Sequence, residues 1–385
     1  MDKNKICRHE NKKYITPATI LALAALSLPM MGASQPVSAA KKIDLMTTSK
    51  SKQALTSVIV NQKLPVLTDD KTGIPVAPTS IFDDTYLKKQ GIDISDLNAN
   101  SVLKLTSLFH IFANQASLSA DTNGNLAVKV LDNSNDFGTR SDSYNLTSGD
   151  IYYIQQLAQN IQSNAFRNKT FNHVVLGEDV NVSIENNKVL INGITMTNLK
   201  PEDVSQDTAG QTYIDFGDVF HQLVTASTSY ASTSQSKDVI QNYSDMNNRY
   251  IDVSKVATGT PIIYVSLPFE YLTDPQPITI KGISNSVTGP TIVINVTDIP
   301  DGNQNVSTQV QLNYIDGTNS LPNSEGHTEP NHVLWNLGIG GQTFNFGSGR
   351  FMGSILAPNA TINAGVNVDG NIVANIVNIT GGESH

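Results

Sequence analysis

Apolar residues near the end of the chain follow a pattern that occurs twice. Residues 353–357 read Gly-Ser-Ile-Leu-Ala and residues 370–374 read Gly-Asn-Ile-Val-Ala, an offset of 17. One turn of a parallel β-solenoid cannot bury its apolar face alone, and it gains a core when the next turn stacks about 4.7 Å away. The repeat therefore predicts stacked coils. Two similar strands of an ordinary β-sandwich are the alternative.

The same offset can be carried further along both copies of the repeat. It places Ile362 opposite Ile379, Thr361 opposite Asn378, and Asn363 opposite Thr380. The apolar positions repeat while the polar ones change. This alignment predicts that both turns place the same kind of apolar residue inside, and that the outside carries no continuous column of threonines.

Short runs rich in β-branched residues recur through the chain and predict a strand-rich domain. A β-like region opens at Phe109–Phe112, and the turn at Asp121–Asn125 leads into the next strand. Asn186-Asn187 marks a strand-turn-strand unit. The predicted strands cover residues 126–130, 174–176, 180–184, 189–194, 261–265, 278–280 and 291–296.

Two segments show helical spacing instead. The first has Ile151, Ile154, Leu157 and Ile161 on one stripe. The second begins after Asp215, a predicted N-cap with Asp218 three residues later. Its apolar stripe consists of Phe216, Val219, Phe220, Leu223 and Tyr230. This stripe needs an apolar wall, which the side of a solenoid or an ordinary sheet would provide.

The first 39 residues have the pattern of a secretory signal peptide. Five basic residues precede the apolar run at 20–31, and Val37-Ser38-Ala39 supplies small residues for cleavage. The run is too short to span a bilayer comfortably, so we expect a mature chain that begins near Ala40. Residues 40–102 are predicted to be a linker or capping segment, and residues 103–385 the main domain.

Charge and cysteine content narrow the class of protein. The chain has 25 Lys and Arg and 34 Asp and Glu, and removing five basic and two acidic residues with the signal leaves 20 and 32, a net charge of −12. Nucleic acid is therefore not an expected ligand. The single cysteine, Cys7, lies within the signal, so the mature chain is expected to depend on core burial instead of disulfides.

The sequence contains no clear catalytic or metal-binding motif. The mature histidines lack metal-ligand spacing, no Gly-x-Ser-x-Gly motif occurs, and Gly338–Gly341 lacks the Lys that follows in a phosphate-binding loop. Asp121, Asp132 and Asp136 are weak calcium candidates, although plain turns explain them better. We therefore assign no catalytic, cofactor-binding or metal-binding residue, and the ligand-binding residues are unknown.

Aromatic residues near the C-terminal repeat have two interpretations. Trp335, Phe344, Phe346 and Phe351 would form a sugar-stacking patch if they were exposed. In a strand-rich context we expect them in the core instead.

Several segments of the C-terminal region form a recognisable series. They are His332–Asn336, Phe351–Thr361, Asp369–Ala374 and Gly382–His385, with Phe109–Asn114 and Thr122–Val128 upstream. Together they resemble the choice-of-anchor A family of bacterial surface adhesins, in particular forms from lactobacilli. The likeness covers residues 103–385. It implies a mainly β fold, a right-handed parallel β-helix of the ice-binding-protein type flanked by a long α-helix. Family members usually continue into a cell-wall anchor, whereas this sequence stops at His385 without a sorting motif.

The resemblance implies a secreted or cell-surface adhesin of a Gram-positive bacterium, without catalysis or cofactor. Its expected partner is a host matrix protein or glycan, with the bacterial cell envelope as a second candidate and no membrane span after signal cleavage. Ice binding and a structural spacer are the alternatives. A polysaccharide hydrolase ranks last because only an analogy of fold favours it.

Overall fold

The computed structural model describes residues 73–140, 147–319 and 329–385. All described residues belong to one compact unit. The expected signal peptide at 1–39, residues 40–72 of the expected linker, and His327 lie outside the described residues.

The largest sheet has twelve strands, and every neighbouring pair in it is parallel. Its main order is β12 (Ile262–Pro268), β14 (Thr291–Thr297), β17 (Val333–Asn336), β20 (Ser354–Ala364), β22 (Ile372–Ile379), β1 (Ile111–Leu118), β3 (Leu126–Ser134), β4 (Asp150–Leu157), β5 (Asn172–Leu176) and β9 (Val204–Gln206). In addition, β18 (Thr343–Phe346) pairs with the second half of β20, and β15 (Asn303–Val306) pairs with β18.

The other strands of the described residues form three smaller sheets. One contains β10 (Ile240–Asn242), β11 (Arg249–Asp252), β13 (Ile278–Ile283) and β16 (Val310–Tyr314), and another contains β19 (Phe351–Met352), β21 (Val368–Asp369), β23 (Glu383–Ser384) and β2 (Asp121–Thr122). The third is antiparallel and contains β6 (Val182–Glu185), β7 (Lys188–Ile191) and β8 (Ile194–Thr195). The predicted strands are thus confirmed, including the hairpin at Asn186-Asn187, except at 189–194. There a turn at Asn192-Gly193 divides the predicted strand into the antiparallel strands β7 and β8.

The helical elements are few and mostly short. They are α1 (Thr85–Lys89), α2 (Ile94–Asn100) and α3 (Phe216–Ala231), with 3-10 turns η1 (Ile81–Asp83), η2 (Lys104–Leu108), η3 (Pro201–Asp203) and η4 (Phe269–Leu272). The helix predicted after Asp215 is confirmed as α3. The Asp215 side chain accepts a hydrogen bond from the Asp218 backbone N–H at 3.0 Å, as the N-cap prediction requires.

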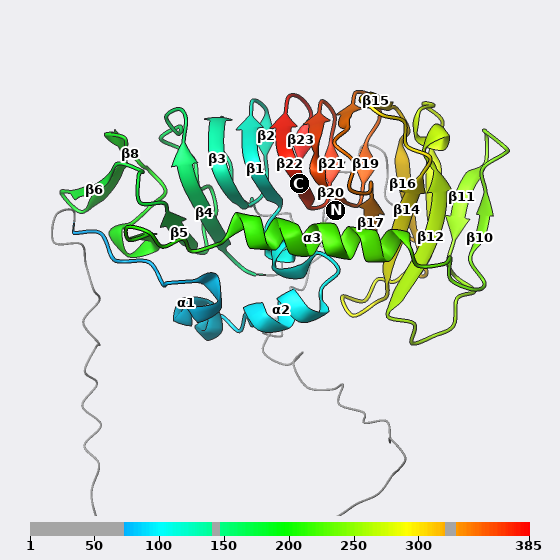
Figure 1. Cartoon of the computed structure of the whole chain (residues 1–385), viewed down its shortest axis with the longest axis horizontal. Coiled ribbons are helices and arrows are strands. Elements are labelled where there is room, and N and C mark those ends of the chain that lie inside the picture. Colours follow the sequence, from blue (N-terminus) through cyan, green and yellow to red (C-terminus); the bar gives the residue numbers. More distant parts are fainter. Residues whose placement is uncertain (1–72, 141–146, 320–328) are drawn as a thin grey trace, which may run out of the picture. The chain divides into compact units, whose positions relative to one another are not determined.

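The chain builds the large sheet in two halves that meet in the middle. It runs from β1 outward to β9, α3 then crosses the row of strands, and the chain returns from β12 to β22 (Figure 1). There β22 pairs with β1 in register, from Ile372 opposite Ile111 to Ile379 opposite Leu118. The apolar stripe of α3 packs on residues such as Phe112 and Val373 that point out of one side of the sheet.

The helix predicted at Ile151–Ile161 is wrong, because residues 150–157 form strand β4. Ile151 and Tyr153 pack in the cluster beneath α3, whereas Tyr152 and Ile154 pack in the interior on the opposite side. A strand buried on both faces reads as a continuous apolar run, so its isoleucines can match helical spacing by coincidence.

The repeat of 17 residues is confirmed only in its first half. Ile355–Ala357 pairs residue by residue with Ile372–Ala374, but the register shifts between Ala357 and Thr361. Pro358 lies inside this shift, and proline has no backbone N–H for a ladder hydrogen bond. Ile362 therefore lies opposite Val377, and the predicted pairing with Ile379 is wrong.

The glycines of the repeat occupy the same crowded corner just before successive strands, β20 and β22. Gly353 and Gly370 have φ values of +113° and +151°. A Cβ atom on Gly370 would lie 2.5 Å from the carbonyl carbon of Gly353. Both conformations are open to glycine and rarely to other residues, which explains why glycine opens both copies.

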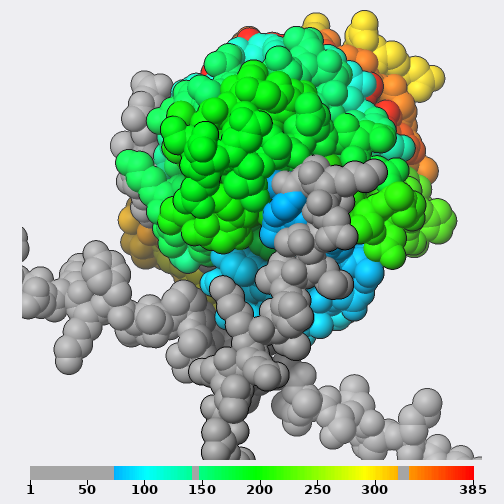
Figure 2. All heavy atoms as spheres, turned by 90° about the vertical axis from the view of Figure 1, so that its left-hand side faces the viewer, coloured from blue at the N-terminus to red at the C-terminus, as the bar shows by residue number. Residues whose placement is uncertain are grey.

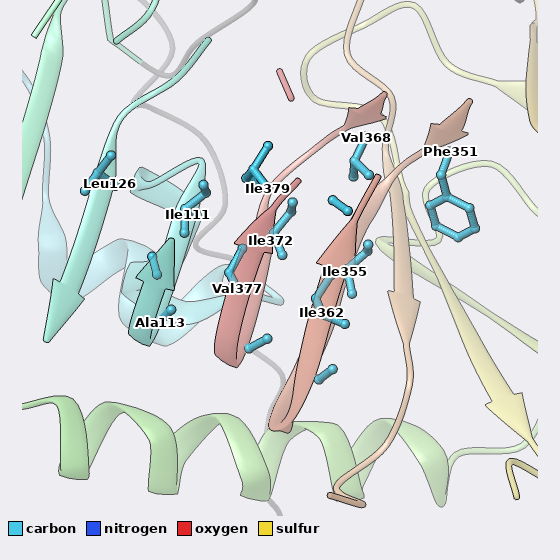
Figure 3. Close-up of a cluster of buried hydrophobic side chains, with 14 of the residues drawn as sticks. Ile111, Ala113, Leu126, Phe351, Ile355, Ile362, Val368, Ile372, Val377 and Ile379 are labelled. Atoms are coloured by element: carbon cyan, nitrogen blue, oxygen red, sulfur yellow. The ribbon is translucent and has the colours of Figure 1, made fainter. Parts of the chain in front are cut away.

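The interior is filled by aliphatic and aromatic side chains from successive strands. Figure 3 shows Ile355 and Ile362 of β20 beside Ile372 and Val377 of β22, with Val368 of β21 reaching into the same cluster. Each is essentially inaccessible to solvent, and burying one such side chain contributes about 1.5–3 kcal/mol.

The expected core location of the aromatic residues is confirmed. Trp335, Phe344, Phe346 and Phe351 are all at most 2% exposed. The Trp335 indole N–H donates to the Met352 carbonyl at 2.9 Å. The sugar-stacking patch is therefore wrong for these four residues.

The sheet of β6, β7 and β8 closes one end of the stack. Val182, Val189 and Ile191 from this sheet are buried in the interior cluster. Figure 2, which faces this end, shows residues of this part of the chain in green covering it. Closing the end shields the core and removes a surface where another stack would dock.

Residues 73–102, the described part of the predicted linker or capping segment, pack against the large sheet. Val76 forms a bridge with Gln206 of the edge strand β9. Ile81, Leu87 and Ile94 are buried in the same cluster as α3. The Asp84 carboxylate, 1% exposed, accepts a hydrogen bond from the Tyr213 hydroxyl at 2.6 Å.

Candidate binding face

After the register shift between Ala357 and Thr361 of β20, six neighbouring strands each point alternate residues outward, and these outward residues lie opposite one another from strand to strand. We call these outward residues the Thr/Asn face. Its first column is Asn303, Thr343, Thr361, Ile376, Gln115 and Val130, and its second is Asn305, Asn345, Asn363, Asn378, Ser117 and Asn133. The strands are β15, β18, β20, β22, β1 and β3, and Asn303 and Asn305 are the most exposed members.

Side-chain amides of the second column form a hydrogen-bonded ladder. The Asn378 amide N–H donates to the Asn363 side-chain oxygen at 2.8 Å, and Asn363 donates to Asn345 at 2.8 Å. Asn345 in turn donates to Asn305 at 3.4 Å. An amide has two N–H donors and an oxygen with two lone pairs, so each inner ladder member keeps one donor and one acceptor for a ligand.

The backbone holds this face rigidly. Phe344, Ile362 and Val377, which lie between the columns, point inward and are fully buried. Neighbouring strands lie about 4.8 Å apart, and residues i and i+2 along a strand about 6.6 Å apart. The face is thus an ordered array of polar groups, interrupted in the first column by the aliphatic residues Ile376 and Val130.

The paired positions of the Thr/Asn face carry no charge. The nearest charged residues along the chain are Lys129 and Asp132 of β3, at one end of the array. Asp132 lies in the register shift between Leu131 and Asn133, which separates it from the paired positions. Contacts with this face must therefore be hydrogen bonds and van der Waals contacts.

The predicted outward alignment was wrong, and the ladder follows from the correction. Thr361 lies opposite Ile376, and Asn363 lies opposite Asn378. Thr343 lies opposite Thr361 on the other side. The missed signal is the recurrence of Thr-x-Asn with a buried residue between, at Thr343 to Asn345 and Thr361 to Asn363.

The other sequence candidates are scattered and engaged in structural contacts. Asp136 forms an ion pair with Arg167, and Asp121 lies 3.2 Å from Arg140. His110 is buried, which lowers the pKa of its imidazole to about 4, and its Nε2 lies 2.8 Å from the Ser384 hydroxyl. Within the described part of the chain, no three His, Cys, Asp or Glu residues are grouped to hold a metal ion.

Two buried carboxyl groups are hydrogen-bonded to tyrosines. The Tyr152 hydroxyl donates to Asp150, and the Tyr153 hydroxyl donates to Asp207, each at 2.6 Å. Burial raises the pKa of both carboxyls, that of Asp207 to about 6. The first bond lies within β4, and the second joins β4 to the residue that follows β9. Both lie on the β3 to β9 half of the domain, away from the Asn ladder.

These features define a mainly β domain of stacked parallel strands that presents a regular, uncharged polar face. Residues 102–385 match the family model described as "Putative Ice-binding-like adhesive domain". The chain belongs to this family. The family is an adhesive one and not a family of enzymes, and membership indicates an extracellular or surface location.

Comparisons with solved structures and with curated proteins do not extend this assignment. The crystal structure of an ice binding protein from an Antarctic bacterium, Flavobacteriaceae, is similar at 10% identity, covering 74% of this chain and 84% of that chain with a TM-score of 0.24. This level of similarity does not establish a common fold. Among curated proteins no significant match was found. In the described residues, no helix has the length and apolar character needed to cross a membrane.

Proposed function

We propose that this chain is an exported bacterial adhesin domain that attaches the cell to host matrix or host glycans through the Thr/Asn face. Family membership supports an adhesive role. The choice-of-anchor A relationship, the lactobacillus type and removal of residues 1–39 belong to the same proposal. So does a right-handed β-helix, which the consecutive parallel sheets favour.

The Asn ladder is the observation that carries this proposal. Its amides are fixed by one another and by buried neighbours, so a ligand need not order them on binding. A single hydrogen bond contributes only about 0.5–1.5 kcal/mol, so one row binds weakly. Repeated rows match a ligand with repeated hydroxyl or amide groups, and many copies on a cell add avidity.

The test is binding of the purified chain to an array of collagens, fibronectin, mucins and glycans. A heat-denatured sample controls for nonspecific capture. Thr361→Lys places a long charged side chain in the centre of the face and should abolish binding. Thr279→Lys on β13 is the matched control, because Thr279 is an outward strand residue of another sheet. Equal binding by both variants would contradict the use of the Thr/Asn face.

Ice binding is the second candidate function, and the regularity of the face favours it. The described columns hold uncharged residues at fixed spacing and no aromatic side chain on which a sugar ring would stack. The same two variants test this candidate by ice-crystal shaping. A blank array together with faceted crystals, lost only in Thr361→Lys, would replace the glycan proposal. Blank results in both assays would favour a structural spacer.

A further inference from the structure

We propose that the Thr/Asn face also binds a second copy of this chain, so that adhesion includes self-association between domains. The inference rests on the proposed use of this face for attachment and adds a partner to it. Three properties of the face favour a second copy as its partner: the spacing of its rows, its remaining hydrogen-bonding groups and its lack of charge.

The spacing of the rows favours a partner with the same repeat. Rows follow the strands, about 4.8 Å apart, and this distance is set by backbone hydrogen bonds. A second copy has the identical spacing, so all rows stay in step when two faces meet about 10 Å apart, as in packed sheets with asparagine ladders. A partner with another repeat matches only a few rows before it falls out of step.

The amides of the ladder are complementary to themselves. Asn363 uses one N–H toward Asn345 and one oxygen lone pair toward Asn378. One N–H and one lone pair remain for a partner. In a two-fold dimer the same patch occurs on both sides of the interface, so each patch must offer donors and acceptors together. The inner ladder members satisfy this requirement.

The charge distribution permits contact between two copies at this face. The chain carries a formal net charge of −9, so two copies repel over most of their surface. The paired positions of the Thr/Asn face carry none of this charge. By contrast, the sheet containing β2 and β23 displays Asp121 and Glu383 near Arg140, and the sheet containing β11 and β13 displays Lys281 over the Tyr250 ring.

Sedimentation velocity of the full chain over a range of concentrations tests the inference. The wild type should rise in mean mass from 41.5 kDa toward twice that value as concentration increases. Asn363→Asp should remain monomeric, because it buries an unpaired negative charge within the uncharged face of each copy. Asn313→Asp is the matched control on the outward side of β16 and should associate like the wild type. Native Trp335 fluorescence verifies folding of each variant.

A mixing experiment makes the test specific for pairing between the two faces. Asn363→Asp and Asn363→Lys should each be monomeric, and an equimolar mixture should recover association, because the two charges in the shared interface then have opposite signs. A wild type that stays monomeric, unchanged association of Asn363→Asp, or a monomeric mixture would each overturn the inference.

The two proposals fail separately. A monomeric wild type that still binds the array would remove self-association and leave the attachment function. A wild type that associates through the face but binds nothing on the array would support self-association and remove the host ligand.

Discussion

The contact between α3 and the large sheet depends on a buried polar node that can be removed by one substitution. The Asn336 side chain, 1% exposed, donates to the Ser227 carbonyl at 3.0 Å and to the Asn295 side-chain oxygen at 2.8 Å. It accepts from the Ser227 hydroxyl at 2.6 Å. Asn295 in turn donates to the Tyr230 carbonyl at 2.7 Å. Asn336→Ala removes the centre of this network.

The loss of stability in Asn336→Ala follows from the polar groups that lose their hydrogen-bond partner and from the space that the side chain leaves. The Asn295 oxygen loses its donor, and a buried polar group without a partner costs about 1–3 kcal/mol. The Ser227 hydroxyl can turn to a helix carbonyl, so it adds little. The lost side-chain atoms leave a small cavity that adds about 1 kcal/mol. We expect Asn336→Ala to lower the free energy of unfolding by about 3 kcal/mol, a large part of the 5–15 kcal/mol typical of a domain.

Urea unfolding followed by fluorescence measures this effect. Trp335 is the single tryptophan, is fully buried and precedes the mutated residue, so its emission reports unfolding of this region. Asn313→Ala on the outward side of β16 should change stability by less than about 0.5 kcal/mol. Combining Asn336→Ala with Ser227→Ala should show a coupling of at least about 1 kcal/mol. Equal effects of Asn336→Ala and Asn313→Ala would refute the role of the node.

Three further predictions concern single substitutions elsewhere in the domain. Gly370→Ala should cost more than about 2 kcal/mol because its Cβ meets backbone at 2.5 Å, whereas Gly341→Ala, with no atom nearer than 4.0 Å, should be almost neutral in urea. Burial raises the pKa of Asp207 to about 6, so the folded state holds this proton more tightly than the unfolded chain does. The resulting stability is complete below about pH 4 and lost as pH rises through 6, so Asp207→Asn should flatten the pH dependence of unfolding between about pH 4 and 7. Asp84 caps α1 through the Tyr86 N–H, so Asp84→Ala should speed amide hydrogen exchange in α1 and leave α3 protected.

Local signals in the sequence were sufficient for some elements and misleading for others. The helix after Asp215 was predictable because its cap and its apolar stripe lie within one continuous segment. The run from Ile151 failed because burial on both faces of β4 removes the alternation that marks a strand. Which faces are covered depends on α3, and that helix lies far away in the sequence.

The candidate site depended on register, which sequence repeats gave only in part. The offset of 17 residues aligned Ile355 with Ile372 correctly. Beyond Pro358 the offset became 15, so Asn363 moved from the predicted partner Thr380 to Asn378. A shift of two residues keeps inward and outward positions unchanged, so the apolar pattern could not reveal it. The ladder became visible only when the strands were placed side by side.

The central claim is that the Thr/Asn face makes the adhesive contact. Its most direct test is titration of the chain, labelled with nitrogen-15 in asparagine, with soluble mucin while the side-chain amide signals are followed by NMR. The signals of Asn345, Asn363 and Asn378 should shift or broaden with saturation, while that of Asn313 stays fixed. Saturable mucin binding that leaves the three ladder amides unchanged would contradict the claim.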